Sequence, residues 1–177
     1  MFGGYAGRYL ATLAVGFVVA LGLTWLSRRL GLRLGVVDAP GGRRRHRGVV
    51  SRLGGLGLMG GVYAALAWAY ADPLPTRDPN ELRRFWGLIA GSAWLLILGL
   101  LDDRYDLPPW AQYAGYLVGA LVATVSLIIL EQFNHPLTDQ LINLPLLLYL
   151  PLTLFWITGM IVTVNWLDGL DGLAGGV

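Results

Sequence analysis

The sequence predicts an all-α membrane protein, a polytopic bundle with five transmembrane spans, its N-terminus outside and its C-terminus in the cytoplasm. Hydrophobic residues make up 55% of the 177 residues and charged residues 14%, and the mean hydropathy is +0.58, which is too apolar for a soluble domain. Five uncharged stretches have the length, roughly 17 to 25 residues, that crosses a hydrocarbon core of ~30 Å. They are residues 9–26, 54–71, 85–101, 110–130 and 144–164.

The first stretch is expected to be a retained span rather than a cleaved signal peptide. Its apolar core is longer than the roughly 7–15 residues of a signal peptide, and arginines follow it instead of small residues. Almost nothing is left over for a soluble domain, so residues 1–177 are predicted to form a single membrane domain. The chain has no cysteine, which excludes disulfides and thiolate metal sites.

Arginines set the predicted orientation. Eight of the 13 basic residues, all of them arginine, lie between the first and second spans, so the positive-inside rule places this loop in the cytoplasm. Counting crossings from there puts residues 102–109 and the segment from Asn165 onward on the same side.

The first inner loop could bind phosphate. Guanidinium groups bind phosphate oxygens in bidentate fashion and stay charged at any relevant pH. The alternatives are that the run only orients the chain or attracts anionic lipid headgroups. The candidate binding residues are Arg43, Arg44, His46, Arg47 and Arg52.

The second inner segment carries a pair of acids, Asp102 and Asp103, directly at the end of an uncharged span. Ionisable residues at a membrane edge are functional candidates, and carboxylates with substrate phosphates are typical ligands of Mg²⁺. In the alternative interpretation the pair caps the next helix or pairs with Arg104.

The third inner segment holds Asn165, Asp168 and Asp171, with a glycine after each aspartate. Glycine permits turns that other residues resist and lets a ligand approach the backbone. A calcium loop is excluded, because it needs ligands at alternate positions and a distal glutamate. A plain loop with a helix cap is the alternative. Together, the basic loop, the acidic pair and the acidic turn on one side of the bilayer indicate machinery for a metal-bound diphosphate.

These motifs resemble those of the polyprenyl-phosphate N-acetylhexosamine-1-phosphate transferases, a glycosyltransferase family 4 type. The matching positions are Asp38, Pro40, Arg43, His46, Gly54, Gly55, Leu101, Asp102, Asp103, Arg104, Asn165, Asp168, Gly169, Asp171, Gly172, Leu173 and Ala174. The chain departs from the usual pattern at Arg44 (lysine), Ser51 (proline) and Val162 (asparagine), and it has Gln112 and Tyr116 where lysine or arginine and then glutamine are usual.

The resemblance implies transfer of a phospho-N-acetylhexosamine from a UDP-sugar to polyprenyl (undecaprenyl) phosphate at the cytoplasmic face of the inner membrane. UMP would be released, and the lipid-linked product would serve cell-envelope polysaccharide synthesis. Residues 52–55 favour this branch over the peptidoglycan-precursor branch. The family implies Mg²⁺, with Mn²⁺ able to substitute, at Asp102 and Asp103, which would also be catalytic, and countercharge or substrate binding by the other motif residues.

The family usually has about ten spans and further inner loops with an aspartate and histidines, so this chain is expected to be the N-terminal half of such an enzyme. Whether it is active alone is left open. A homodimer is a further option, and no nucleic acid is expected. The alternatives are an intramembrane Mg²⁺-dependent prenyltransferase and a catalytically inactive half-length protein that binds lipid phosphate.

The absence of native cysteine makes the topology testable. Gly48→Cys should react with a membrane-impermeant maleimide only from the cytoplasmic face, and Asn80→Cys only from outside. Labelling of intact and permeabilised cells measures this. If both cysteines react from the same side, the span count is wrong, and the three motifs do not share a face.

Overall fold

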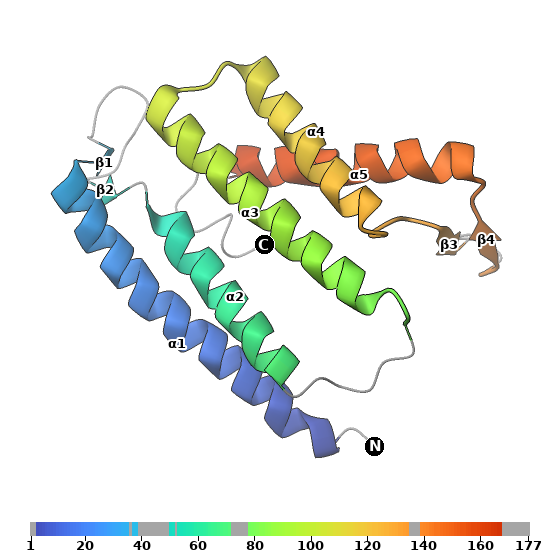
Figure 1. Ribbon diagram of the computed structural model, residues 1–177, viewed down its shortest axis with the longest axis horizontal. Helices are drawn as coiled ribbons and strands as arrows, with labels where there is room; N and C mark the ends of the chain where they lie inside the picture. Colours follow the sequence, from blue (N-terminus) through green and yellow to red (C-terminus); the bar gives the residue numbers. More distant parts are fainter. Residues whose placement is uncertain are drawn as a thin grey trace. The chain divides into compact units, whose positions relative to one another are not determined.

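A computed structural model describes residues 3–35, 37–38, 50–51, 53–71, 78–134 and 139–167 (Figure 1). The chain separates into two compact units, Met1–Thr76 and Arg77–Val177. The first holds α1 (Gly3–Leu34), β1 (Val37–Asp38), β2 (Val50–Ser51) and α2 (Gly54–Ala71). The second holds α3 (Glu81–Tyr105), α4 (Pro109–Val125), β3 (Gln132–Asn134), β4 (Leu141–Asn143) and α5 (Leu146–Leu167).

The helical prediction is confirmed in its main lines, with corrections. Each of the five predicted spans falls on a helix, but two short antiparallel hairpins, β1–β2 and β3–β4, add strand that an all-α prediction does not contain. Within the part of the chain that the structure describes, three segments are long and apolar enough to cross a membrane: Ala6–Arg33, Glu81–Tyr105 and Leu146–Trp166. The other two helices are shorter, α2 having 18 residues with five glycines and α4 having 17. The chain is a membrane protein, while the count of five spans stays a prediction.

Small residues let α1 and α2 approach closely. Gly16, Ala20 and Thr24 follow one another at helical spacing on α1, and they meet Ala65, Gly61 and Gly57 of α2 in reverse order. A methyl group added to Gly61 would lie 2.5 Å from Cβ of Ala20. Because lipid is as apolar as leucine, helices in a membrane associate through such close packing rather than through hydrophobic burial. The two helices therefore form an antiparallel hairpin.

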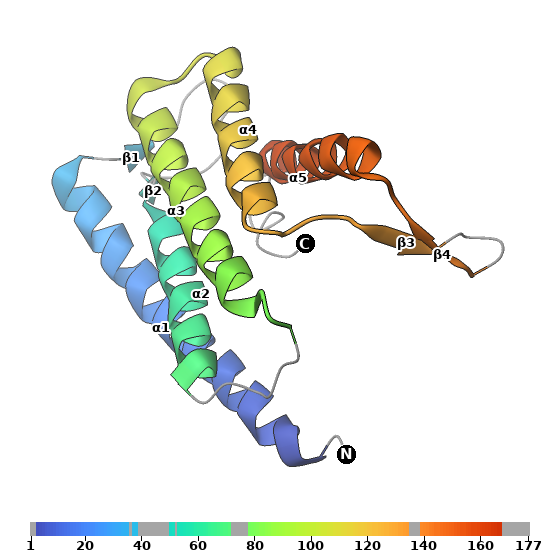
Figure 2. The ribbon, with the colours of Figure 1, turned by 45° about the vertical axis from the view of Figure 1, so that its right-hand side comes forward.

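The second hairpin, α3 with α4, uses the same device together with a hydrogen bond. In both views the two helices run side by side in opposite directions (Figures 1 and 2). Gly115 of α4 leaves room for Leu98 of α3, and Gly119 leaves room for Leu95. The indole Nε1 of Trp94 donates to the carbonyl oxygen of Gly115 at 2.8 Å. These contacts therefore fix α3 and α4 relative to each other in the half of the hairpin that is nearer to the connecting loop, residues 106–108.

The predicted span at residues 110–130 is wrong at its end, because α4 stops at Val125. Leu127 adopts a left-handed conformation (φ 63°), and the amides of Leu127 and Ile128 donate back to the carbonyls of Thr124 and Ala123. This arrangement is a Schellman motif, normally built on glycine. Arg83 of α3 then donates to the carbonyl of Val125 at 2.6 Å. The last carbonyls of α4 are thus satisfied by the turn itself and by the neighbouring helix.

The chain then reaches α5 through the β3–β4 hairpin, in which Gln132 pairs with Asn143 and Asn134 with Leu141. Ahead of the hairpin, the amide of Leu130 donates to the hydroxyl of Thr153, a side chain that is 1% exposed. The helix α5 crosses α4 at a wide angle instead of running alongside it (Figure 2). It covers residues 146–167 rather than the predicted 144–164.

The α1–α2 contact can be tested with the same substitution at two glycines. Gly61→Ala should lower the thermal midpoint of the chain in detergent, because the new methyl collides with Ala20; overpacking of this kind typically costs about 1–3 kcal/mol. Gly22→Ala on α1 meets nothing within 4 Å and is the matched control. It should leave the midpoint unchanged or raise it, since alanine is the better helix former. Equal midpoints for the two variants would contradict the packing.

At the left-handed turn after α4, a substitution is expected to stabilise the chain instead of destabilising it. Leu127→Gly should stabilise the chain by roughly 1 kcal/mol, because a left-handed conformation costs about 1–2 kcal/mol for a residue with a side chain and nothing for glycine. Leu130→Gly, where φ is not positive, should destabilise it. Thermal unfolding of both variants checks this, and a destabilised Leu127→Gly would show that its side chain matters more than its backbone.

Candidate functional site

The acidic pair lies where the sequence predicts it, in the last turn of α3, which ends at Tyr105. Asp102 is half-buried and Asp103 is exposed. The C-terminal end of a helix carries the negative end of the helix dipole, so two carboxylates there are in an unfavourable place unless donors or cations offset them. The contacts of Asp102 therefore decide what this site can do.

Two neutral donors hold the Asp102 carboxylate. The backbone amide of Leu107 donates to Oδ1 at 3.0 Å, and the side-chain amide of Gln112 donates to the same oxygen at 2.8 Å. Within the described residues no donor reaches Oδ2, and no cationic side chain pairs with Asp102. Among the described residues, the donors to Asp102 are thus neutral, and both of them meet the same one of its two oxygens.

The loop between α3 and α4 is built around the backbone of Asp102. The amide of Asp106 donates to the Asp102 carbonyl at 2.8 Å, and Asp106 itself is left-handed with φ 47°, a conformation that aspartate tolerates better than most residues. Pro109 occupies the first turn of α4, where its missing amide hydrogen costs nothing. The alternative in which the acids cap the next helix is not seen, because α4 has no side-chain cap and Asp102 instead accepts from the loop amide of Leu107.

Sequence reasoning missed the role of Gln112. It noted only that lysine or arginine is usual at this position, whereas the structure shows the amide Nε2 bridging Oδ1 of Asp102 and the carbonyl of Leu107, the latter at 3.1 Å. Tyr116, one turn further along α4, is half-buried and lies within electrostatic range of Asp102. The signal that could have found both is their spacing of four residues, which places them on one face of α4.

The other predicted site residues are only partly covered. Asn165 lies in the last turn of α5 and is exposed. The remaining candidates, Arg43, Arg44, His46, Arg47, Arg52, Asp168 and Asp171, lie outside the described residues. Among the residues that the structure describes, no group of three or more acids or histidines could hold a metal ion. The convergence of the three motifs stays a prediction.

Three of the arginines assigned to the first inner loop belong to a helix. Arg28, Arg29 and Arg33 lie within α1, which extends to Leu34 instead of ending near residue 26. The guanidinium of Arg29 stacks 3.7 Å from the ring centre of Trp25. Cations are favoured at the C-terminal end of a helix, and a stacked arginine and tryptophan suit the headgroup layer.

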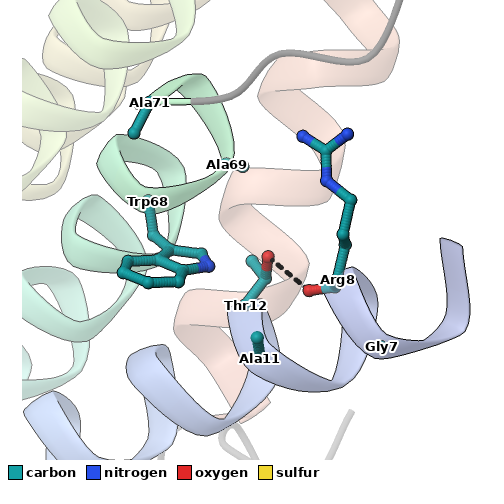
Figure 3. Close-up of a pocket in the computed structure, with 7 residues that line it drawn as sticks. All are labelled: Gly7, Arg8, Ala11, Thr12, Trp68, Ala69 and Ala71. Carbon is teal, nitrogen blue, oxygen red and sulfur yellow. Dashed lines mark hydrogen bonds between the residues drawn. The ribbon is translucent and has the colours of Figure 1, made fainter.

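A cavity of about 270 Å³ opens at the other end of the α1–α2 hairpin. It lies between the start of α1 and the end of α2, where Thr12 lies toward the ring of Trp68 and the side chain of Arg8 extends away from that ring (Figure 3). The Thr12 hydroxyl donates to the Arg8 carbonyl at 2.9 Å, an ordinary bond within a helix. The described residues that line this cavity, Gly7, Arg8, Ala11, Thr12, Trp68, Ala69 and Ala71, belong to none of the three predicted motifs.

Comparison with known families defines the class. Residues 85–177 match the model of glycosyl transferase family 4, which covers the acidic pair, Asn165 and the acidic turn. The chain belongs to this family. No solved structure matches the chain.

The relatives are glycosyl-1-phosphate transferases. A probable undecaprenyl-phosphate N-acetylglucosaminyl 1-phosphate transferase of Bacillus subtilis is 29% identical over 96% of this chain and 45% of its own length. The undecaprenyl-phosphate α-N-acetylglucosaminyl 1-phosphate transferase of Yersinia pestis is 28% identical over 91% and 42%. The decaprenyl-phosphate N-acetylglucosaminephosphotransferase of Mycolicibacterium smegmatis is 30% identical over 97% and 44%. The chain thus spans a little under half the length of these relatives.

Proposed function

We propose that this chain supplies part of the active site of a transferase that moves phospho-N-acetylhexosamine from a UDP-sugar to polyprenyl phosphate. In this reaction an oxygen of the acceptor phosphate attacks the β-phosphorus of the UDP-sugar. The phosphoanhydride bond breaks, UMP leaves, and a lipid-linked diphosphate sugar remains. The observation that carries the proposal is the half-buried Asp102 carboxylate, whose charge no described cation offsets, at the end of a span-length helix of a family 4 chain.

The place of the acids suits the two substrates. A polyprenyl phosphate keeps its chain in the bilayer and presents its phosphate at the headgroup layer, where a water-soluble nucleotide sugar can meet it. In the predicted topology the last turn of α3 lies at the cytoplasmic face of the inner membrane, together with the arginines at the end of α1. The names of the relatives, which specify undecaprenyl or decaprenyl phosphate, support this acceptor class.

The donor set fits a divalent cation. Mg²⁺ is usually held by one or two carboxylates together with substrate phosphates and water, so Asp102 and Asp103 suffice without a third acid. A carboxylate at the negative end of a helix dipole, whose donors among the described residues are all neutral, favours a cation on the oxygen that these donors do not meet. When bound, Mg²⁺ would offset the negative charge of the diphosphate.

The residues of the chain would then mainly bind and position the substrates. Phosphoryl transfer asks for alignment and stabilisation of charge rather than covalent chemistry. Asp102 would fix the position of the cation, and Asp103, exposed beside it, would face the acceptor phosphate. Asn165 and the predicted acidic turn of Asp168 and Asp171 would organise the nucleotide. The arginines of the first loop would supply countercharge.

Family membership favours this reaction over the intramembrane prenyltransferase. A half-length protein that binds lipid phosphate without turnover is the remaining alternative. To distinguish this alternative, the chain can be produced together with the C-terminal half of the Bacillus subtilis relative, a part that this sequence does not contain. Turnover by the two halves together would then favour the transferase.

The acids can be tested in that complete system. Membranes with Mg²⁺, sugar-labelled UDP-N-acetylglucosamine and undecaprenyl phosphate should form labelled lipid and release UMP. Asp102→Asn and Asp103→Asn keep the size but remove the charge, and each should reduce the rate at least ~10²-fold, as is typical of deleting one electrostatic catalytic element.

Asp106→Asn is the matched control, since it removes a neighbouring charge at a left-handed position that asparagine tolerates equally well. It should change the rate far less. Near-normal turnover in both Asp102→Asn and Asp103→Asn would place the metal elsewhere. If the chain binds lipid phosphate but shows no turnover with the C-terminal half of any relative, the result would favour the half-length protein that binds lipid phosphate without turnover.

A further inference from the structure

We infer that Gln112 is a positioning residue for Asp102: its amide aims the carboxylate so that Oδ2, and not Oδ1, meets the divalent cation. The inference rests on the proposed function, because it concerns the same metal site. It adds a residue on a second helix, and it assigns different tasks to the two oxygens of one carboxylate.

The hydrogen bonds define the orientation. Nε2 of Gln112 lies 2.8 Å from Oδ1 of Asp102 and 3.1 Å from the carbonyl oxygen of Leu107. Both partners are acceptors, so the NH₂ end of the amide must face them, and its two hydrogens are both used. The Leu107 amide donates to the same Oδ1 at 3.0 Å. Two donors converging on one oxygen fix the plane of the carboxylate and leave Oδ2 on its other side.

Gln112 is itself held rigidly. It lies in the first turns of α4, where its backbone amide donates to the carbonyl of Pro108 at 3.2 Å. Three residues along, Gly115 packs against Leu98 of α3 and accepts the hydrogen bond of Trp94, which fixes α4 against the helix that carries Asp102. The backbone that carries Gln112 is therefore fixed relative to the helix that carries Asp102.

The charge of the donor matters as much as its position. Unlike the lysine or arginine that is usual at this position, the amide of Gln112 holds the carboxylate without bringing a charge of its own. Outer hydrogen bonds of this kind typically contribute 10–100-fold to metal affinity. Gln112 would thus orient Asp102 through a neutral donor.

A merely structural role is the competing explanation, since the same bonds close the α3–α4 loop. The two roles separate in Asp102→Asn, because asparagine still accepts at Oδ1 but no longer attracts a cation. A structural contribution of Gln112 should persist in that background, whereas a contribution to metal binding should vanish.

The experiment measures Mn²⁺ binding to the purified chain in detergent, by EPR of the free ion, together with thermal unfolding. Gln112→Met keeps the length and removes the donor, and we expect its Mn²⁺ affinity to fall about tenfold. In Asp102→Asn the affinity should already be lost, and adding Gln112→Met should change only the thermal midpoint. Gln140→Leu, at an exposed glutamine, is the matched control and should bind Mn²⁺ like the unmodified chain.

If Gln112→Met does not fold, Gln112→Asn serves instead, because it withdraws the amide by one carbon and should weaken Mn²⁺ binding in the same direction. Unchanged affinity in the folded Gln112 variant, with loss in Asp102→Asn, overturns the inference and leaves the proposed metal site standing. No saturable binding by the unmodified chain, or binding indifferent to both Asp102→Asn and Asp103→Asn, overturns the metal site and the inference with it.

Discussion

A backbone amide or carbonyl without a partner costs several kcal/mol in hydrocarbon, and this constraint governs where the second unit of the chain leaves its helices. At the end of α4 the turn satisfies its own carbonyls, and Arg83 reaches across from α3 to the carbonyl of Val125. The amide of Leu130, already outside the helix, is met by the buried hydroxyl of Thr153. These contacts tie α4 to both of its neighbours.

The same scarcity of water makes close helix contact valuable, and small residues provide it in both hairpins. Gly57 and Gly61 face α1, and Gly115 and Gly119 face α3. Because their spacing of four residues places each pair on one helix face, these glycines let the two backbones approach closely. Their partners could not be predicted, since the sequence does not say which helix Ala20 or Leu98 will meet.

Apolar runs predicted where the helices lie but not how they end. The run from residue 110 to 130 contains no charge, proline or glycine near its end, yet α4 stops at Val125 because Leu127 turns left-handed. Nothing in a leucine signals that conformation, so the sequence could not predict it. The sequence did not predict the β3–β4 hairpin either, because the pairing of Phe133 with Ile142 depends on the residues at which α4 ends and α5 begins.

The acidic pair shows what sequence can and cannot say about a site. Two adjacent carboxylates at the end of an apolar run identify a place of unfavourable charge, which is why Asp102 was found. The sequence could not show that the loop and Gln112 would both donate to one oxygen while no donor among the described residues reaches the other. That division follows from the short connection of α3 to α4, which places the amide ten residues later beside the carboxylate. A neutral donor there stabilises the loop without removing the charge that a cation requires, so the same contact can support the fold and the chemistry.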